Sequence, residues 1–136
     1  MKKFILIVLI LLLASPAMAF WGVNKGTRYV VFDNISIGKL GVLISAPVPM
    51  KDTIGKLSYF VLVKRAAKIT MTYLVGPGIN NTFITPADGG AIKAGCDNTS
   101  EVFDNITTAI FTDEMKIKIT ETHNATGAVT LHLIVQ

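Results

Sequence analysis

The chain has 136 residues, of which 51% are hydrophobic and 16% charged, and its formal net charge is +4 at pH 7. This length predicts a single domain, and the small charge, with only one short basic cluster at residues 64–68, argues against a nucleic-acid partner. The single cysteine, Cys96, excludes a disulfide within the chain, so we expect a free thiol, a buried thiol or a bond to another chain.

Residues 1–19 have the pattern of a secretory signal peptide. Lys2 and Lys3 form a basic start, an apolar run follows from Phe4 to Leu13, and the segment ends in Ala17-Met18-Ala19, with small residues where a signal peptidase reads. The apolar run is shorter than the ~20 residues that a membrane-spanning helix needs. We therefore expect cleavage before residue 20, export to the periplasm, cell surface or medium, and no membrane span in the mature chain. Loss of the two lysines lowers the formal charge from +4 to +2.

Two large aromatic residues, Phe20 and Trp21, would begin the mature chain. Adjacent aromatic side chains at the start of an exported protein are usually there to be buried, by the chain's own sheet or by another chain. The Gly-Val-Asn-Lys-Gly stretch that follows is flexible enough to carry them away from the domain. We expect this arm to dock on a neighbouring subunit or partner; folding back as an edge strand of its own domain is the alternative.

Four segments in the first half of the mature chain have the composition and periodicity of strands: residues 27–33, 41–46, 56–64 and 67–75. Pro47 and Pro49 end the second segment. The third is apolar on both faces, which predicts a strand buried on both sides. The fourth alternates, with Thr70 and Thr72 on the outward side.

The second half continues the pattern. Residues 81–86 and 90–95 predict weaker strands, and residues 105–112 lead into a final pair of strands at 115–122 and 128–136. Asn124 and Gly127, between the last two strands, suit positive φ in a tight turn. We therefore predict a C-terminal β-hairpin that buries one row of side chains on a single face, namely Ile117, Ile119, Leu131 and Leu133.

These elements predict an all-β fold. They amount to about eight short, mostly antiparallel strands separated by turn signals, and no stretch of the mature chain has the periodicity of an amphipathic helix. Regularly spaced short strands of this kind are typical of sandwiches and barrels. We predict one β-sandwich over residues 20–136, either Ig-like or jelly-roll-like.

One short sequence occurs twice: VFDNIS at residues 31–36 and VFDNIT at residues 102–107. In both copies Asp-Asn follows an apolar pair, and this dipeptide readily forms an Asx-turn and tolerates left-handed backbone. We interpret the repeat as a strand–turn–strand corner that is used twice. The similarity ends with these residues, so coincidence of turn chemistry explains it at least as well as duplication.

The repeat also contains sequons for N-glycosylation. Five asparagines stand in N-x-Ser/Thr: Asn34, Asn80, Asn98, Asn105 and Asn124. Such density is typical of a glycosylated surface protein. The alternative is that asparagine ends strands and threonine begins them, which produces the same pattern without any glycan.

The sequence contains no recognisable catalytic set. His123 falls in a turn and His132 on the polar side of the last strand, where strand spacing gives no chelating pair. Nothing in the sequence pairs Cys96 with a histidine, and no glycine-rich phosphate loop is present. We predict that the protein is not an enzyme and has no cofactor. A weak calcium candidate is the loop carrying Asp97, Asn98, Glu101 and Asp104, whose spacing is not that of an EF-hand.

An exported, single-domain, all-β chain without a catalytic set resembles the subunits of surface filaments as a class. We therefore predict a structural subunit or accessory of an extracellular filament, pilus or cell-surface assembly, with itself or another surface or pilus subunit as its partner. The alternative is a secreted or periplasmic binding module for a ligand, an ion or a partner protein. The first predicts self-association, and the second predicts a monomer with a pocket.

Overall fold

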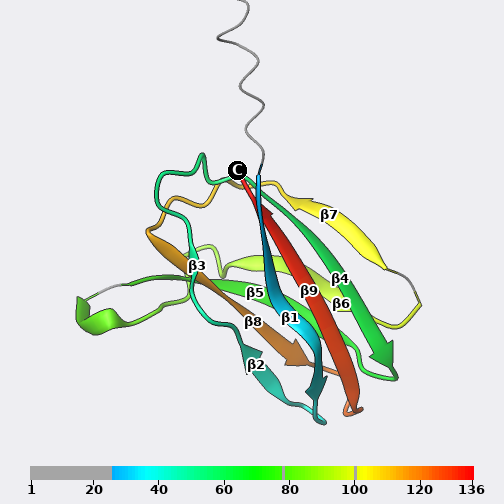
Figure 1. Cartoon of the computed structure of the whole chain (residues 1–136). Helices are drawn as coiled ribbons and strands as arrows, with labels where there is room; N and C mark the ends of the chain where they lie inside the picture. The colour runs from blue at the N-terminus through cyan, green and yellow to red at the C-terminus, as the bar shows by residue number, and fades with distance from the viewer. Residues whose placement is uncertain (1–25, 78, 100) are drawn as a thin grey trace, which may run out of the picture.

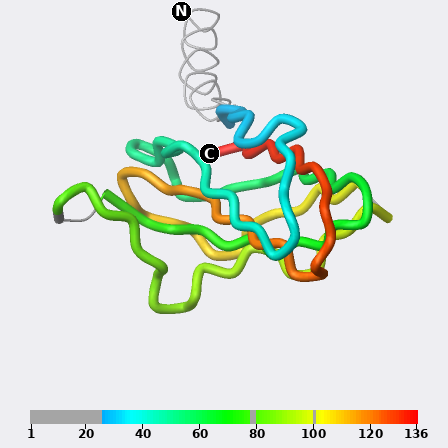
Figure 2. The backbone as a smooth tube through the Cα atoms, turned by 90° about the horizontal axis from the view of Figure 1, so that it is seen from below, coloured from blue at the N-terminus to red at the C-terminus, as the bar shows by residue number. Residues whose placement is uncertain are grey.

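The computed structural model describes residues 26–77, 79–99 and 101–136 of the chain. Within these residues nine strands form two antiparallel sheets, which pack face to face as two layers (Figures 1 and 2). The expected signal peptide, Phe20 and Trp21 lie outside the described residues. No helix in the described part of the chain is both long and apolar enough to cross a membrane.

In chain order the strands are β1 (Thr27–Ile37), β2 (Val42–Ile44), β3 (Val48–Pro49), β4 (Leu57–Arg65), β5 (Ile69–Gly76), β6 (Ala91–Cys96), β7 (Val102–Ile106), β8 (Glu114–Glu121) and β9 (Gly127–Val135). A short 3-10 helix, η1 (Ile79–Asn81), lies between β5 and β6. Sheet A has the strand order β1-β9-β4-β7. Sheet B has the order β2-β8-β5-β6, and β3 also pairs with β8.

The chain alternates between the two sheets. Over the described residues each connection between consecutive strands crosses from one sheet to the other, except β2–β3 and β5–β6. This alternation, with the first and last strands adjacent in sheet A, is the strand order of a jelly roll. The prediction of an all-β sandwich is confirmed, and the structure has the jelly-roll order of the two that the sequence left open.

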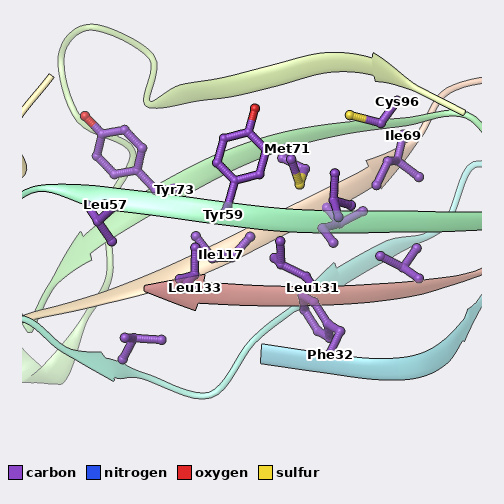
Figure 3. Packing of buried hydrophobic residues seen from close by; sticks show 14 of the residues in the cluster. Phe32, Leu57, Tyr59, Ile69, Met71, Tyr73, Cys96, Ile117, Leu131 and Leu133 are labelled. Carbon is purple, nitrogen blue, oxygen red and sulfur yellow. The ribbon is translucent and has the colours of Figure 1, made fainter. Parts of the chain in front are cut away.

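The predicted C-terminal hairpin is wrong, although its buried residues are correct. β8 belongs to sheet B and β9 to sheet A, so the two strands do not pair. Their apolar rows instead meet across the core, where Figure 3 shows Ile117 of β8 beside Leu131 and Leu133 of β9. Alternation shows which side of a strand is buried but not which strand lies next to it. A short polar turn can connect two strands of different sheets as well as the two strands of a hairpin.

The interpretation of the repeat as a corner used twice is also wrong. The first copy lies inside β1 and the second lies in β7 and its end, and these strands form the two edges of sheet A (Figure 1). The two phenylalanines face opposite ways: Phe32 is buried in the core, whereas Phe103 is 64% exposed. Register shifts on both sides of Phe32 in β1 explain the difference, because each extra residue turns the following side chains to the other face.

Only one side of β4 is buried, contrary to the sequence prediction. Leu57, Tyr59, Val61 and Val63 are buried between the sheets, but Phe60 and Leu62 on the outer side remain partly exposed. Of the two weaker segments, residues 90–95 overlap all of β6 except Cys96, whereas residues 81–86 contribute a single bridge between Ile84 and Val75. The strand β7 was missed, because its residues were interpreted as a turn.

The core lies between the sheets, and among the described residues one charged side chain is buried, that of Glu121, which is 1% exposed. Its carboxylate accepts hydrogen bonds from the backbone N–H groups of Leu40 (2.8 Å), His123 (2.7 Å) and Lys68 (3.4 Å). These donors belong to three different connections at one end of the sandwich. Burial raises the pKa of Glu121, but the backbone donors outweigh it, and the pKa lies below its ordinary value. Glu121 therefore ties three loops together as a carboxylate.

Candidate functional site

A row of side chains crosses all four strands on the outer face of sheet A, and three of its four members are apolar. Backbone register aligns one residue from each strand: Val30, His132, Phe60 and Phe103. The adjacent row holds Arg28, Ile134 and Ser58 from β1, β9 and β4, followed by Asn105 of β7. Val30 is 60% and Phe103 is 64% exposed. No strand of the described residues lies over this face, and its outward side chains are partly or largely exposed.

A shallow groove of about 270 Å³ crosses this face, lined by Arg28, Phe60, Phe103, His132 and Ile134. The Arg28 guanidinium donates a hydrogen bond to Nδ1 of His132. The imidazole lies against Phe60, with ring centroids 5.9 Å apart and planes inclined by 44°. The groove thus has an aromatic and aliphatic floor with an arginine at one side, which suits an aromatic or aliphatic side chain better than an ion.

Polar residues surround the apolar row. Ser58 donates a hydrogen bond to the Asn105 side chain (2.6 Å) in the row beside it, and Lys64 donates to Oδ1 of Asn34 (3.2 Å) at the far end of β1. The backbone N–H of Asn34 also donates to Oγ1 of Thr130 (3.1 Å). An apolar centre with a hydrogen-bonded polar rim is the usual organisation of a protein–protein interface.

The five sequon asparagines are all exposed: Asn34, Asn80, Asn98, Asn105 and Asn124. Three of them, Asn34, Asn80 and Asn124, have positive φ (50°, 63° and 50°), as predicted for Asn124. Asparagine is among the few residues that adopt this conformation readily, so the backbone alone explains its presence there. Glycosylation stays a prediction, and at Asn34 or Asn105 a glycan would stand on the rim of the apolar face.

The acidic residues of the calcium candidate make separate local contacts. Oδ1 of Asp97 accepts hydrogen bonds from the backbone and hydroxyl of Thr99, which lower the pKa of Asp97. Asp104 accepts from the backbone N–H of Asn105 and from Lys93, and its pKa is lowered as well. Glu101 is exposed. Among the described residues, no group of three or more acidic, histidine or cysteine side chains is arranged to hold a metal ion.

A second, polar cleft of about 230 Å³ lies where β6 of sheet B meets β7 of sheet A. Lys93 and Asp104 form an ion pair across it at 3.4 Å. The Tyr73 hydroxyl donates a hydrogen bond to Oδ2 of Asp88, with 3.3 Å between the two oxygens. Burial raises the pKa of Tyr73. Both members of the ion pair are nearly half exposed, so the pair contributes little to stability.

Cys96 is buried in the core, one of the states that the sequence left open (Figure 3). Burial raises the pKa of its thiol, so the thiolate that a nucleophile needs is disfavoured. His132 belongs to the groove of sheet A, and the backbone of His123 donates to Glu121. The groove was missed at the sequence level. Its signal was present in β4, whose outward residues Phe60 and Leu62 are as apolar as the inward ones.

Comparison with known proteins identifies the fold. Neither a protein-family model nor a characterised sequence matches the chain. Among solved structures, T=1 particles derived from infectious bursal disease virus match 80% of this chain and 30% of theirs, at 12% identity and a TM-score of 0.55. The structure of the Gt strain of that virus matches at 14% identity over 82% of this chain and 32% of its own, with a TM-score of 0.50.

A carbohydrate-binding module in complex with calcium and xylotriose matches 81% of this chain and 99% of the module, at 9% identity and a TM-score of 0.46, too low to support a conclusion. The chain spans about a third of the length of the viral proteins. At these identities the similarities show the fold alone. Fold and surface together define a jelly-roll β-sandwich with one uncovered aromatic sheet face, which fits a structural or binding module.

Proposed function

We propose that the protein is an exported structural subunit of an extracellular or cell-surface assembly, in which copies of the chain associate through the outer face of sheet A. The observation that carries the proposal is the row Val30–His132–Phe60–Phe103, which is apolar at three of its four positions, crosses four strands and is covered by no strand of the described residues. A contiguous apolar patch with a polar rim marks an interaction site on a protein that is otherwise soluble.

Burial of such side chains supplies the driving force. Covering one exposed phenylalanine contributes roughly 1.5–3 kcal/mol. The charges on this face are few, so association requires little desolvation of ions. The polar rim pairs internally through Ser58–Asn105 and Lys64–Asn34, which leaves few unsatisfied groups when a partner approaches.

We take a second copy of the chain as the partner, because the chain itself carries two adjacent aromatic residues, Phe20 and Trp21, that suit an apolar face. Phe20 and Trp21 would begin the mature chain, six residues before the first described residue, Gly26. The same fold occurs in the protein of the T=1 viral particles described above. Export rests on the signal-peptide pattern of residues 1–19. The intact mass of secreted protein tests it, because a mass that retains these residues contradicts export by this route.

Sedimentation of the mature chain tests the self-association. We expect its mass to increase with concentration and expect Phe103→Ser to abolish that increase. Phe111→Ser is the matched control, because Phe111 is 81% exposed and lies outside sheet A, in the connection before β8. A monomer at all concentrations, or equal effects of the two substitutions, would contradict the proposal.

The binding-module alternative has one observation in its favour, the polar cleft between β6 and β7. Its hydroxyl, carboxylate and ammonium groups, from Tyr73, Asp88 and Lys93, suit a small polyhydroxylated ligand better than an apolar one. Titration with a panel of soluble oligosaccharides, repeated with Asp88→Ala, tests this function. Binding that Asp88→Ala removes, by a chain that stays monomeric, would favour the module over the subunit.

A further inference from the structure

We propose that the groove on sheet A is the docking site for the Phe20–Trp21 segment of a second copy. This inference rests on the proposed function and names the part of the partner that fills the site.

The chain joins sheet A at the margin of the groove. Thr27 pairs with Val135 and Arg28 with Ile134, so the first residues of β1 lie beside the end of β9 (Figure 1). Gly26 packs so closely on Ile134 that a Cβ there would collide with the Cγ2 methyl group. Ile134 and Arg28 both line the groove. The segment that precedes Gly26 therefore starts next to the groove of its own copy, and its direction decides which groove it reaches.

The segment is long enough to extend well beyond its own sheet. Phe20 lies six positions before Gly26, so an extended segment places it up to roughly 20 Å from Gly26. A segment that continues the direction of β1 passes beyond the end of sheet A. It has to reverse to lie on its own groove, but it reaches the groove of a copy placed at that end without reversal. The geometry thus favours docking between copies.

The groove matches an aromatic side chain in size and in chemistry. Its volume of about 270 Å³ is below the 300–1,000 Å³ of typical ligand pockets, so it accommodates one or two side chains instead of a whole ligand. Phe60, Phe103 and Ile134 offer apolar and ring surfaces for an indole. The Arg28 guanidinium at the margin adds a cation–π contact to an aromatic ring that lies beside it.

Trp21 provides its own probe, because it is the only tryptophan in the chain. Its fluorescence emission moves to shorter wavelength when the indole leaves water. The experiment records the emission of the mature chain from tens of nanomolar to hundreds of micromolar, with the mass from sedimentation at each concentration. The variants are Phe103→Ser in the groove and Phe111→Ser as the exposed-phenylalanine control.

We expect the emission to move to shorter wavelength together with the increase in mass, and expect Phe103→Ser to abolish both changes while Phe111→Ser leaves them. Short-wavelength emission that is already present in the monomer at the lowest concentration would overturn the inference, because the arm then lies on its own domain. An increase in mass without any change in emission would also overturn it, but would leave the proposed self-association standing. No change in either quantity would contradict both.

Discussion

The two outer faces of the sandwich differ although the same strand periodicity builds both. On sheet B the outward side chains of β8 and β5 are mostly lysine and threonine: Lys116, Lys118, Thr120, Thr70 and Thr72. Lys116 lies over the ring of Phe83, 4.2 Å from its centroid, so the loop before β6 reaches this face. On sheet A the corresponding positions of β4, β7 and β9 include Phe60, Leu62, Phe103 and Ile134.

The difference separates two requirements that a strand's sequence has to meet. Inward positions must be apolar in both sheets, because the sheets bury each other. Outward positions are polar where water is the neighbour and apolar where another surface is to be covered. On sheet B most outward positions of β5 and β8 are polar, although Val42 and Ile44 of β2 are apolar and 51% and 54% exposed. On sheet A the outward positions of β4 and β7 include Phe60, Leu62 and Phe103. The comparison supports the proposal that a partner covers sheet A.

The largest effect should come from the inward positions, which the two sheets share. Leu131→Ala in sheet A and Ile119→Ala in sheet B each remove a fully buried side chain and should each cost about 2–5 kcal/mol of unfolding free energy. Thr72→Ala, on the outer face of sheet B, should cost less than about 1 kcal/mol. Denaturant unfolding measures all three, and a small loss at either buried position would mean that the core is not shared.

The next effect concerns Glu121, the carboxylate that joins loops from both sheets. Its pKa is below the ordinary value, so its contribution to stability is complete above that value, 4.5, and is lost as pH falls through the folded-state pKa. Glu121→Gln should therefore lower the thermal midpoint at neutral pH. The gap to the parent chain should narrow as pH falls below about 4.5. A gap that stays constant across this range would contradict the role of the carboxylate.

A smaller effect is expected at Tyr59, the inward neighbour of Phe60 on β4. Burial, together with the nearby Asp104 and Cys96, raises its pKa from 10.0 to about 12. The neutral phenol therefore contributes stability that is complete below pH 10 and is lost as pH rises from 10 towards 12. Tyr59→Phe should lose less stability than the parent chain over this interval. Equal losses in thermal unfolding would show that Tyr59 ionises normally in the folded state.

The smallest effect on folding should come from the outer face of sheet A. Phe103 is 64% exposed, so Phe103→Ser should change the unfolding free energy of the dilute monomer by less than about 1 kcal/mol. The same substitution should remove association. A large loss of stability in the dilute monomer would instead make Phe103 a structural residue, and the two faces would no longer differ in role.

Much of this fold could be predicted from sequence, because alternation within one strand is a local property. It correctly predicted the inward rows of β8 and β9, and the outward Thr70 and Thr72 of β5. It could not predict that β8 and β9 belong to different sheets, because that depends on pairings distant in the chain. The interpretation of the repeated sequence as a corner was wrong for a related reason. Register shifts around Phe32 turn one copy inward, and no such shift interrupts the pairing of β7 with β4.

The candidate site was only partly accessible from sequence. The doubly apolar pattern of β4 indicated that both of its sides would be covered, and the structure covers one. Phe103 and His132 lie in the same row as Phe60 because of the strand order and the pairing register of sheet A, and both depend on contacts distant in the chain. The sequence thus indicated that β4 carries apolar residues on both sides. The strand order of sheet A shows that the outward ones form a surface with Phe103 and His132.

Methyl NMR of the mature chain over a concentration series tests most directly whether the two faces differ in this way. Both faces carry outward methyl groups, Leu62 and Ile134 on sheet A, and Val42 and Ile44 on sheet B. The account predicts that the resonances of Leu62 and Ile134 shift or broaden as concentration rises, while those of Val42 and Ile44 keep their positions. Changes confined to Val42 and Ile44, or no change on either face, would contradict it.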